Sequence, residues 1–284
     1  MDKRVAYIGL IFIAAIWGST FPIIKNTLFY IDPLSFLVYR FLIASLFLLP
    51  FIIKKIRKKD AIYGSLVGVP LFAGYATQTI GLNYTSPSMS GLITGLYVVL
   101  TPVLSIFILK TRGDYIKILL AIIAFIGMAL MTLNSTSGEL IGNLLTLVCA
   151  FAYAGQLIFT EKFLVNGDAM VFTFFQLLTV GVLSLLFHPQ SIIAAVKLEN
   201  HYVLFSVLFN AILGSALAIW IMSIAVKNTN SYISALILIT EPIFAVLIST
   251  FLFKYPITIS MIIGGIIILI SMVFAINREN KKIN

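Results

Sequence analysis

The stretch ALILITEPIFAVLIST, from Ala235 to Thr250, places one charged residue, Glu241, among apolar neighbours. No other acidic or basic residue lies within ten positions on either side, so a helix formed here has no face that water would cover. Apolar segments of about twenty residues are typical of bilayer-spanning helices, because about 30 Å of hydrocarbon requires that many residues at 1.5 Å each. The stretch therefore predicts a membrane-spanning helix with a carboxyl group near its middle.

The whole chain has the composition of a membrane protein. Of its 284 residues, 61% are hydrophobic and 10% are charged, and the mean hydropathy is +1.09. A soluble protein of this composition would expose large apolar patches. The single cysteine, Cys149, rules out an internal disulfide, and its neighbours lack the spacing of metal ligands. We expect no metal and no cofactor.

Ten apolar spans with short links predict an all-α polytopic membrane protein. An even number of spans places both termini on one side of the membrane. Of the 19 basic residues, fifteen fall on that side, three fall on the other, and Arg40 lies inside the second span. Because excess Lys and Arg marks the cytoplasmic side, we expect a multi-pass plasma-membrane protein with cytoplasmic termini. The spans are 5–24, 33–53, 61–82, 87–109, 115–133, 140–160, 169–187, 202–226, 231–253 and 256–276.

The net charge of +9 is also typical of proteins that bind nucleic acid. The basic residues, however, cluster beside apolar spans, as in KKIRKKD at 54–60, and such loops set the orientation of membrane proteins. We therefore expect contact with the lipid bilayer and no nucleic-acid partner. The sequence allows a monomer or a homodimer.

Two segments of the chain resemble each other. GLNYTSPSMSGLITGLYVVLTPVLSIFIL (81–109) is similar to SIAVKNTNSYISALILITEPIFAVLIST (223–250), since each has a polar turn with threonine, a helix rich in small residues and a polar residue before proline. The Thr-Pro and Glu-Pro dipeptides at 101–102 and 241–242 align at an offset of 140. This similarity predicts an internal repeat.

The offset changes along the repeat. The turn residues Thr85 and Thr229 align at 144, and WGSTFPIIKN (17–26) aligns with YAGQLIFTEK (153–162) at 136. Small insertions therefore separate the two copies. We expect them to occupy 1–134 and 135–284.

Each copy holds five spans, and an odd number requires the second copy to enter the membrane from the opposite side. Inverted repeats are typical of transporters, in which the substrate binds near the midplane between the halves. The repeat therefore favours a transport function.

The motifs of both halves resemble those of one transporter family. WGS at 17–19, YTS at 84–86, Pro102 inside a span and the Glu-Pro pair at 241–242 are similar to the EamA-like ten-helix branch of the drug/metabolite transporter superfamily. The resemblance implies cytoplasmic termini and a central cavity formed mainly by spans one, three, four, six, eight and nine. It also implies efflux or exchange of amino acids, small polar metabolites or amphipathic drugs.

Two charges lie deep in the predicted spans, Glu241 and Arg40. A charge at the bilayer centre costs about 2.5–3.5 kcal/mol on insertion scales, so each should face protein or a water-filled cavity. Glu241 is either a substrate-amine contact or proton-coupling group, or a structural acid bonded to a carbonyl that Pro242 leaves without its donor. Arg40 is either a substrate contact or a structural partner of a neighbouring helix.

Polar and aromatic residues form stripes on several spans. Thr94, Tyr97 and Thr101 share one helical face, and Tyr153 and Gln156 lie on another. Such side chains suit a polar solute with an apolar body, although single members are also common at helix-packing and membrane-interface positions. The predicted substrate-binding residues are Trp17, Tyr75, Gln78, Tyr97, Tyr153, Gln156, Trp220 and Glu241.

Together these patterns predict a secondary transporter, an exporter of small organic solutes that works by alternating access. No GxxxxGK[ST] motif is present, so we expect a gradient rather than ATP hydrolysis by this chain as the energy source. A membrane-embedded enzyme acting on lipid or prenyl chains is one alternative, but the acidic residues are not clustered as its metal chemistry needs. We expect no catalytic residues. A channel is the other alternative.

Overall fold

Proline and short polar side chains mark the starts of several helices. Asp32 accepts a hydrogen bond from the Ser35 amide at 2.8 Å, directly before a helix whose first residue is proline. Ser86 caps the helix that begins at Pro87 in the same way. These caps satisfy backbone N–H groups that a helix leaves without partners, and proline at the first position has no such group to lose.

The computed structural model describes residues 3–110, 113–132, 139–253 and 257–281. The described residues form helices and short links, without a strand, which confirms the all-α prediction. The predicted repeat boundary at 134 and the basic residues Arg112, Lys254 and Lys282 lie outside the described residues. The helices are α1 (Lys3–Thr27), α2 (Pro33–Ile52), α3 (Lys58–Gly81), α4 (Pro87–Thr94), α5 (Tyr97–Ile108), α6 (Tyr115–Thr132), α7 (Leu140–Phe163), α8 (Ala169–Phe187), η2 (Pro189–Glu199), α9 (His201–Ala211), η3 (Ile212–Leu217), α10 (Ala218–Asn228), α11 (Ser231–Leu238), α12 (Glu241–Phe253) and α13 (Ile259–Lys281).

Within the described ranges, nine helical stretches are long and apolar enough to cross a membrane. They include α4 with α5, and α9 with η3 and α10, each pair or trio counted as one stretch. Helix α3, at 24 residues, is long enough but less apolar. It packs between α7 and α8, so protein rather than lipid covers much of it. The predicted count of ten spans stays a prediction.

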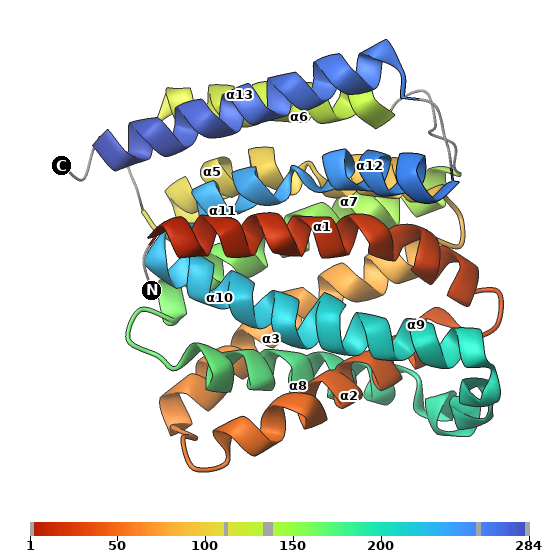
Figure 1. Cartoon of the computed structure of the whole chain (residues 1–284). Coiled ribbons are helices and arrows are strands. Elements are labelled where there is room, and N and C mark those ends of the chain that lie inside the picture. The colour runs from red at the N-terminus through yellow and green to blue at the C-terminus, as the bar shows by residue number, and fades with distance from the viewer. Residues whose placement is uncertain (1–2, 111–112, 133–138, 254–256, 282–284) are drawn as a thin grey trace.

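The outermost layer supports a membrane location. Helices α6 and α13 lie side by side at one edge of the bundle (Figure 1). Their apolar side chains are exposed, among them Ile126, Ile263 and Phe274. Apolar surface of this extent is stable in lipid and costly in water. The protein is therefore a multi-pass membrane protein.

Two of the membrane-crossing stretches are broken near their middle. Helices α4 and α11 each contain eight residues and are followed by a new helix after a short break. Their first residues, Pro87 and Ser231, lie 144 positions apart, as do Tyr97 and Glu241, which begin α5 and α12. The helix breaks therefore follow the offset of 144, so that Tyr97, and not Thr101, holds the position that corresponds to Glu241.

Local hydrogen bonding explains the second break. The Thr240 amide bonds to the Ile237 carbonyl, and the Ile243 amide bonds to the Thr240 carbonyl, each three residues back. Pro242 has no N–H to continue the four-residue pattern, and proline is tolerated in the first turn of a helix, where it stands here. The helix is thus interrupted for two residues, Ile239 and Thr240, directly before Glu241.

Candidate functional site

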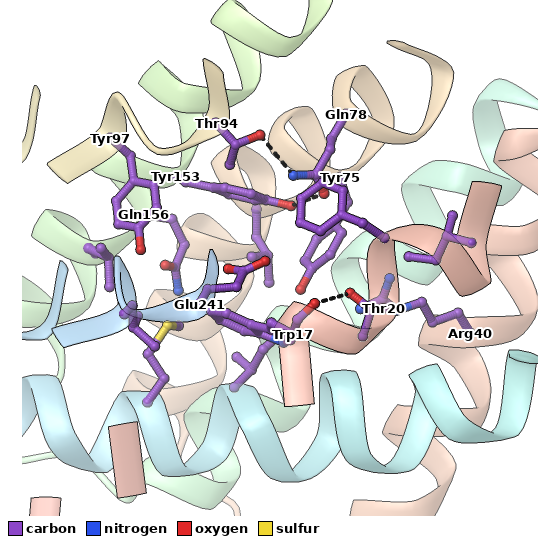
Figure 2. A pocket seen from close by; sticks show the side chains of 17 residues that line it. Trp17, Thr20, Arg40, Tyr75, Gln78, Thr94, Tyr97, Tyr153, Gln156 and Glu241 are labelled. Carbon is purple, nitrogen blue, oxygen red and sulfur yellow. Dashed lines mark hydrogen bonds between the residues drawn. The ribbon is translucent and has the colours of Figure 1, made fainter. Parts of the chain in front are cut away.

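A cavity lies in the interior of the bundle, beside both helix breaks. It contains about 670 Å³ of empty space, counting its open side. Figure 2 shows polar and aromatic side chains from several helices pointing into it. The lining residues are Trp17, Thr20, Phe21, Ile24, Arg40, Leu71, Tyr75, Gln78, Thr94, Tyr97, Tyr153, Gln156, Leu157, Ile219, Met222, Leu238 and Glu241.

Arg40 is the cationic residue of the cavity wall and is only 2% exposed. Its Nε donates to Ser215 Oγ at 2.7 Å, and its Nη2 donates to the Gly214 carbonyl at 3.2 Å. The guanidinium also lies over the ring of Tyr75, 4.6 Å from its centre. Among the residues that the structure describes, no carboxylate forms an ion pair with it. Neutral groups therefore hold this charge, and its ability to attract an anion is retained.

The backbone that holds Arg40 has an unusual conformation. Residues Ile212–Leu217 form a π-helical turn, η3, in which the wider turn disturbs the regular hydrogen-bond pattern. The Gly214 carbonyl in this turn accepts from Trp17 Nε1 at 2.9 Å as well as from Arg40. A π turn is frequently found at functional sites, and here it joins α1, α2 and η3 at one oxygen.

Glu241 is the acidic residue of the wall. It is the first residue of α12, and its side chain points into the space enclosed by Trp17, Tyr97, Tyr153 and Gln156 (Figure 2). No hydrogen bond or ion pair to this carboxylate is found within the described part of the chain. The backbone is fixed by Gly18 of α1, because a Cβ atom there would lie 2.8 Å from the Glu241 carbonyl oxygen. The side chain is thus placed in the cavity without an internal partner.

Hydrogen bonds set the orientation of the polar residues above Glu241. Gln78 Nε2 donates to Thr94 Oγ1 at 3.0 Å, and the Tyr153 hydroxyl donates to Gln78 Oε1 at 3.2 Å. The rings of Tyr75 and Tyr153 meet edge to face, 5.4 Å apart. This network joins α3, α4 and α7, and one helix break begins directly after Thr94, so the hydrogen bond from Gln78 fixes the cavity wall beside the break.

A second network supports Gln156 from behind. Gln156 Nε2 donates to Gln176 Oε1 at 2.9 Å, and Gln176 Nε2 lies 3.5 Å from Ser223 Oγ. Thr173 donates to the same serine at 3.1 Å. All four residues are buried. Buried polar groups without partners are costly, so this chain of bonds holds α7, α8 and α10 in one register.

Comparison with known proteins decides the family. The model of the EamA-like transporter family matches residues 4–133 and again 140–277. The chain belongs to the EamA-like transporter family. The two matches together cover almost the whole chain. The resemblance seen in the short motifs is confirmed.

Relatives of this EamA-like protein are named as transporters. An uncharacterized transporter of Archaeoglobus fulgidus is 32% identical over 96% of this chain and 86% of its own length. The uncharacterized transporters YvbV and YyaM of Bacillus subtilis are each 27% identical, over 96% and 95% of this chain and 91% and 92% of theirs. The protein is therefore a membrane transporter.

One solved crystal structure has the same fold as the EamA-like chain. It superposes with a TM-score of 0.77 over 99% of both chains, at 14% sequence identity. At this identity the likeness shows the fold alone. It agrees with the helix arrangement described above and gives no information on the solute.

The cavity brings together most of the residues that the sequence singled out. Seven of the eight predicted substrate-binding residues line it, and so does Arg40. Trp220 is the exception, because on α10 its neighbours Ile219 and Met222 face the cavity and Trp220 lies on a different side of the helix. Trp220 is therefore removed from the candidate site. The others are Trp17, Tyr75, Gln78, Tyr97, Tyr153, Gln156 and Glu241.

Two kinds of residue that build the site were not found from the sequence. The apolar wall residue Leu71 lies four positions before Tyr75 on the same helix, so helical periodicity could have found it. Gly214 and Ser215 hold Arg40 from another helix, and no local pattern marks a π turn. Thr101 of the predicted stripe bonds to its own helix, at the Tyr97 carbonyl, and does not line the cavity.

Proposed function

We propose that this EamA-like protein is a secondary transporter that exports small zwitterionic solutes with a partly apolar body, by alternating access around the central cavity. The observation that carries the proposal is the placement of Arg40 and Glu241 in one cavity wall, each without an oppositely charged partner among the described residues. A solute carboxylate paired with Arg40 and a solute ammonium paired with Glu241 would satisfy both charges. An isolated charge at this depth is costly, so occupancy would stabilise the protein.

The remaining lining suits the body of such a solute. Phe21, Leu71 and Leu157 form apolar parts of the wall, and Trp17 and Tyr97 add aromatic surface. Small-molecule sites commonly have mostly apolar walls and a few oriented polar groups. The walls of this cavity have that composition, with Arg40 and Glu241 as its charged groups. Amino acids and small amphipathic amines with an acid group have these features.

Broken helices at the cavity support alternating access. The breaks after Thr94 and Leu238 lie in corresponding places of the two halves. Discontinuous helices at the interface of inverted repeats are typical of secondary transporters, in which one repeat rocks against the other around a fixed site. We propose that units 1–134 and 135–284 are such repeats, with both termini in the cytoplasm of a plasma-membrane protein.

Counterflow into proteoliposomes tests the proposal. Vesicles preloaded with an unlabelled neutral amino acid such as phenylalanine should accumulate the labelled compound, with uptake that saturates and depends on the internal pool. Glu241→Gln keeps the shape of the side chain and removes its charge, so uptake should fall about tenfold or more, as for the loss of one charge-assisted bond. The matched control is Glu139→Gln, at an exposed position outside the cavity.

Other outcomes would favour the alternatives. Flux that rises linearly with concentration and ignores the internal pool indicates a channel. Turnover of a prenyl or lipid precursor by the purified protein indicates an enzyme. If a panel of amino acids and amphipathic amines shows no counterflow, while an anion without an amine does, the role of Glu241 in binding a solute ammonium is wrong.

A further inference from the structure

Lys25 fastens the far end of α1 to the turn between α3 and α4. It lies close to the end of α1, half-buried. Its ammonium donates to the main-chain carbonyls of Leu82, Asn83 and Thr85. These carbonyls lie at and beyond the C-terminal end of α3, where the helix dipole favours a cation. We call this set of contacts the Lys25 latch.

Glu161 makes the corresponding connection at the end of α7. Its Oε2 accepts a hydrogen bond from the backbone N–H of Ser231 at 2.7 Å. Ser231 is the first residue of α11, and the N-terminal end of a helix favours an anion. We call this contact the Glu161 latch. No ion pair with Glu161 is seen in the described ranges, so the helix end is its partner.

The two latches occupy equivalent places in the two halves. Lys25 and Glu161 are related by the offset of 136 that aligns their segments, and each lies eight positions after a cavity aromatic residue, Trp17 or Tyr153. Lys25 reaches the region before α4, and Glu161 reaches the start of α11, the helix related to α4 by the offset of 144. Lys25 is a cation that donates to backbone carbonyls, and Glu161 is an anion that accepts from a backbone N–H.

The latches lie at opposite ends of the bundle. Thr85, in the turn held by Lys25, donates to Asn143 Oδ1 near the start of α7. Glu161 is 18 residues further along the same helix, which is about 27 Å at 1.5 Å per residue. The cavity residues Tyr153 and Gln156 lie between these levels. One latch therefore lies toward each end of the bundle, with cavity residues between the two levels.

A second cavity gives access to the Glu161 latch. Glu161, Ser231 and Tyr232 line a polar cavity with about 760 Å³ of empty space, its open part included, together with Lys117 and Glu279. Lys117 and Glu279 are paired with each other at 3.1 Å. This cavity lies at the end of α11 away from the break at Glu241, so water and solute can reach the latch from that side.

We propose that Lys25 and Glu161 are positioning residues that hold the two ends of the central cavity closed, and that each half of the transport cycle releases one latch while the other remains bonded. This inference rests on the proposed alternating-access function. Both latches are formed in this structure, and the proposed cycle releases them one at a time. Release of the Lys25 latch frees α1 from the α3–α4 turn, and release of the Glu161 latch frees α7 from α11.

Labelling of one cavity cysteine from each face tests the latches. The reporter is Met222→Cys, which lines the cavity, in a Cys149→Ala background. A membrane-impermeant maleimide is applied to right-side-out or to inverted vesicles that contain the full chain. Lys25→Met should raise labelling about tenfold from the face opposite the termini only, as expected for one lost charge-assisted bond. Glu161→Gln should raise it similarly from the face that carries the termini only.

Matched controls are the exposed neighbours, Asn26→Ala and Lys162→Gln, which should leave both labelling rates unchanged. The inference is overturned if the two latch variants raise labelling from the same face, if neither changes it, or if the controls act as strongly. Should Lys25→Met fail to accumulate in the membrane, Lys25→Gln retains a neutral donor and should give a smaller increase from the same face. Labelling needs no solute, so failed counterflow with the expected labelling would refute the proposed solute class and leave the latches standing.

Discussion

The indole nitrogen of Trp17 lies 2.9 Å from the carbonyl oxygen of Gly214. The same oxygen accepts from Arg40, so donors from α1 and α2 meet at one carbonyl of the π turn η3. A carbonyl carries only a partial charge, and it therefore satisfies the hydrogen bonds of Arg40 without neutralising the guanidinium. This arrangement keeps a buried cation available at the cavity wall, where an acidic partner would cancel it.

The support of Arg40 can be tested at Ser215. Ser215→Ala removes the acceptor of the Arg40 Nε bond and should lower the free energy of unfolding by about 1.5–3 kcal/mol, the usual range for a bond to a charged group. Thermal unfolding of the purified protein in detergent measures the change. The matched control is Ser45→Ala on α2, a buried serine that bonds only to its own helix, at the Leu42 carbonyl. Equal loss of stability in both variants would contradict a special role for Ser215.

A pair of glycines tests the packing of α1 against Glu241. At Gly18 an added Cβ would lie 2.8 Å from the Glu241 carbonyl and 3.0 Å from the Ala245 nitrogen, both backbone atoms that cannot move alone. Gly18→Ala should therefore displace the start of α12, lower the unfolding temperature and reduce counterflow. At Gly91, also helical, nothing lies within 4 Å of an added Cβ. Gly91→Ala should be neutral or stabilising by up to about 1 kcal/mol, because alanine favours helix.

The sequence predicted the fold well because membrane helices are specified locally. Apolar length and the positions of Pro and Gly are visible in single segments, and the described helices agree with the expected spans to within a few residues at most ends. The predicted span 256–276 ends earlier than α13, which continues to Lys281. The predicted end was placed too early because the last turns of α13 are polar. A helix can continue beyond the hydrocarbon into water.

Cavity residues were predicted correctly where helical periodicity placed two of them on one face of a helix. They were missed where the facing of a helix depends on its packing against other helices. Tyr75 with Gln78, and Tyr153 with Gln156, lie three positions apart and line the cavity together. Trp220 was chosen as an aromatic residue deep in its predicted span, yet the side of α10 that faces the cavity depends on packing and on the turn η3 before it. The sequence comparison aligned the two prolines and so matched Glu241 with Thr101. The helix breaks in the structure instead match Glu241 with Tyr97, since these residues begin α12 and α5.

Adjacent glycines on α13 test its packing against α6. An added Cβ at Gly264 would lie 2.3 Å from the Gly127 carbonyl oxygen, whereas at Gly265 the nearest atom is 3.8 Å away. Gly264→Ala should force the helices apart and cost about 1–3 kcal/mol, as overpacking does. Gly265→Ala should have little effect. Comparison of unfolding temperatures, at equal detergent and lipid, measures both, and a larger effect at Gly265 would show that the α6–α13 contact is wrong.

Cysteine labelling tests the topology of the chain. Asn83, Asn200 and Lys58 are exposed positions in loops or at a helix end, and Cys149 is fully buried, so the native thiol gives little background. Helix α3 has 24 residues, which separates Lys58 from Asn83 by about 36 Å and places them on opposite faces. Cysteines at Asn83 and Asn200 should react with an impermeant maleimide added outside intact cells, and a cysteine at Lys58 should react only after lysis. Reaction of Lys58→Cys alone in intact cells would mean that the predicted orientation is reversed. Reaction of Asn83→Cys without Asn200→Cys would place these loops on different sides, and the ten-span topology would then be wrong.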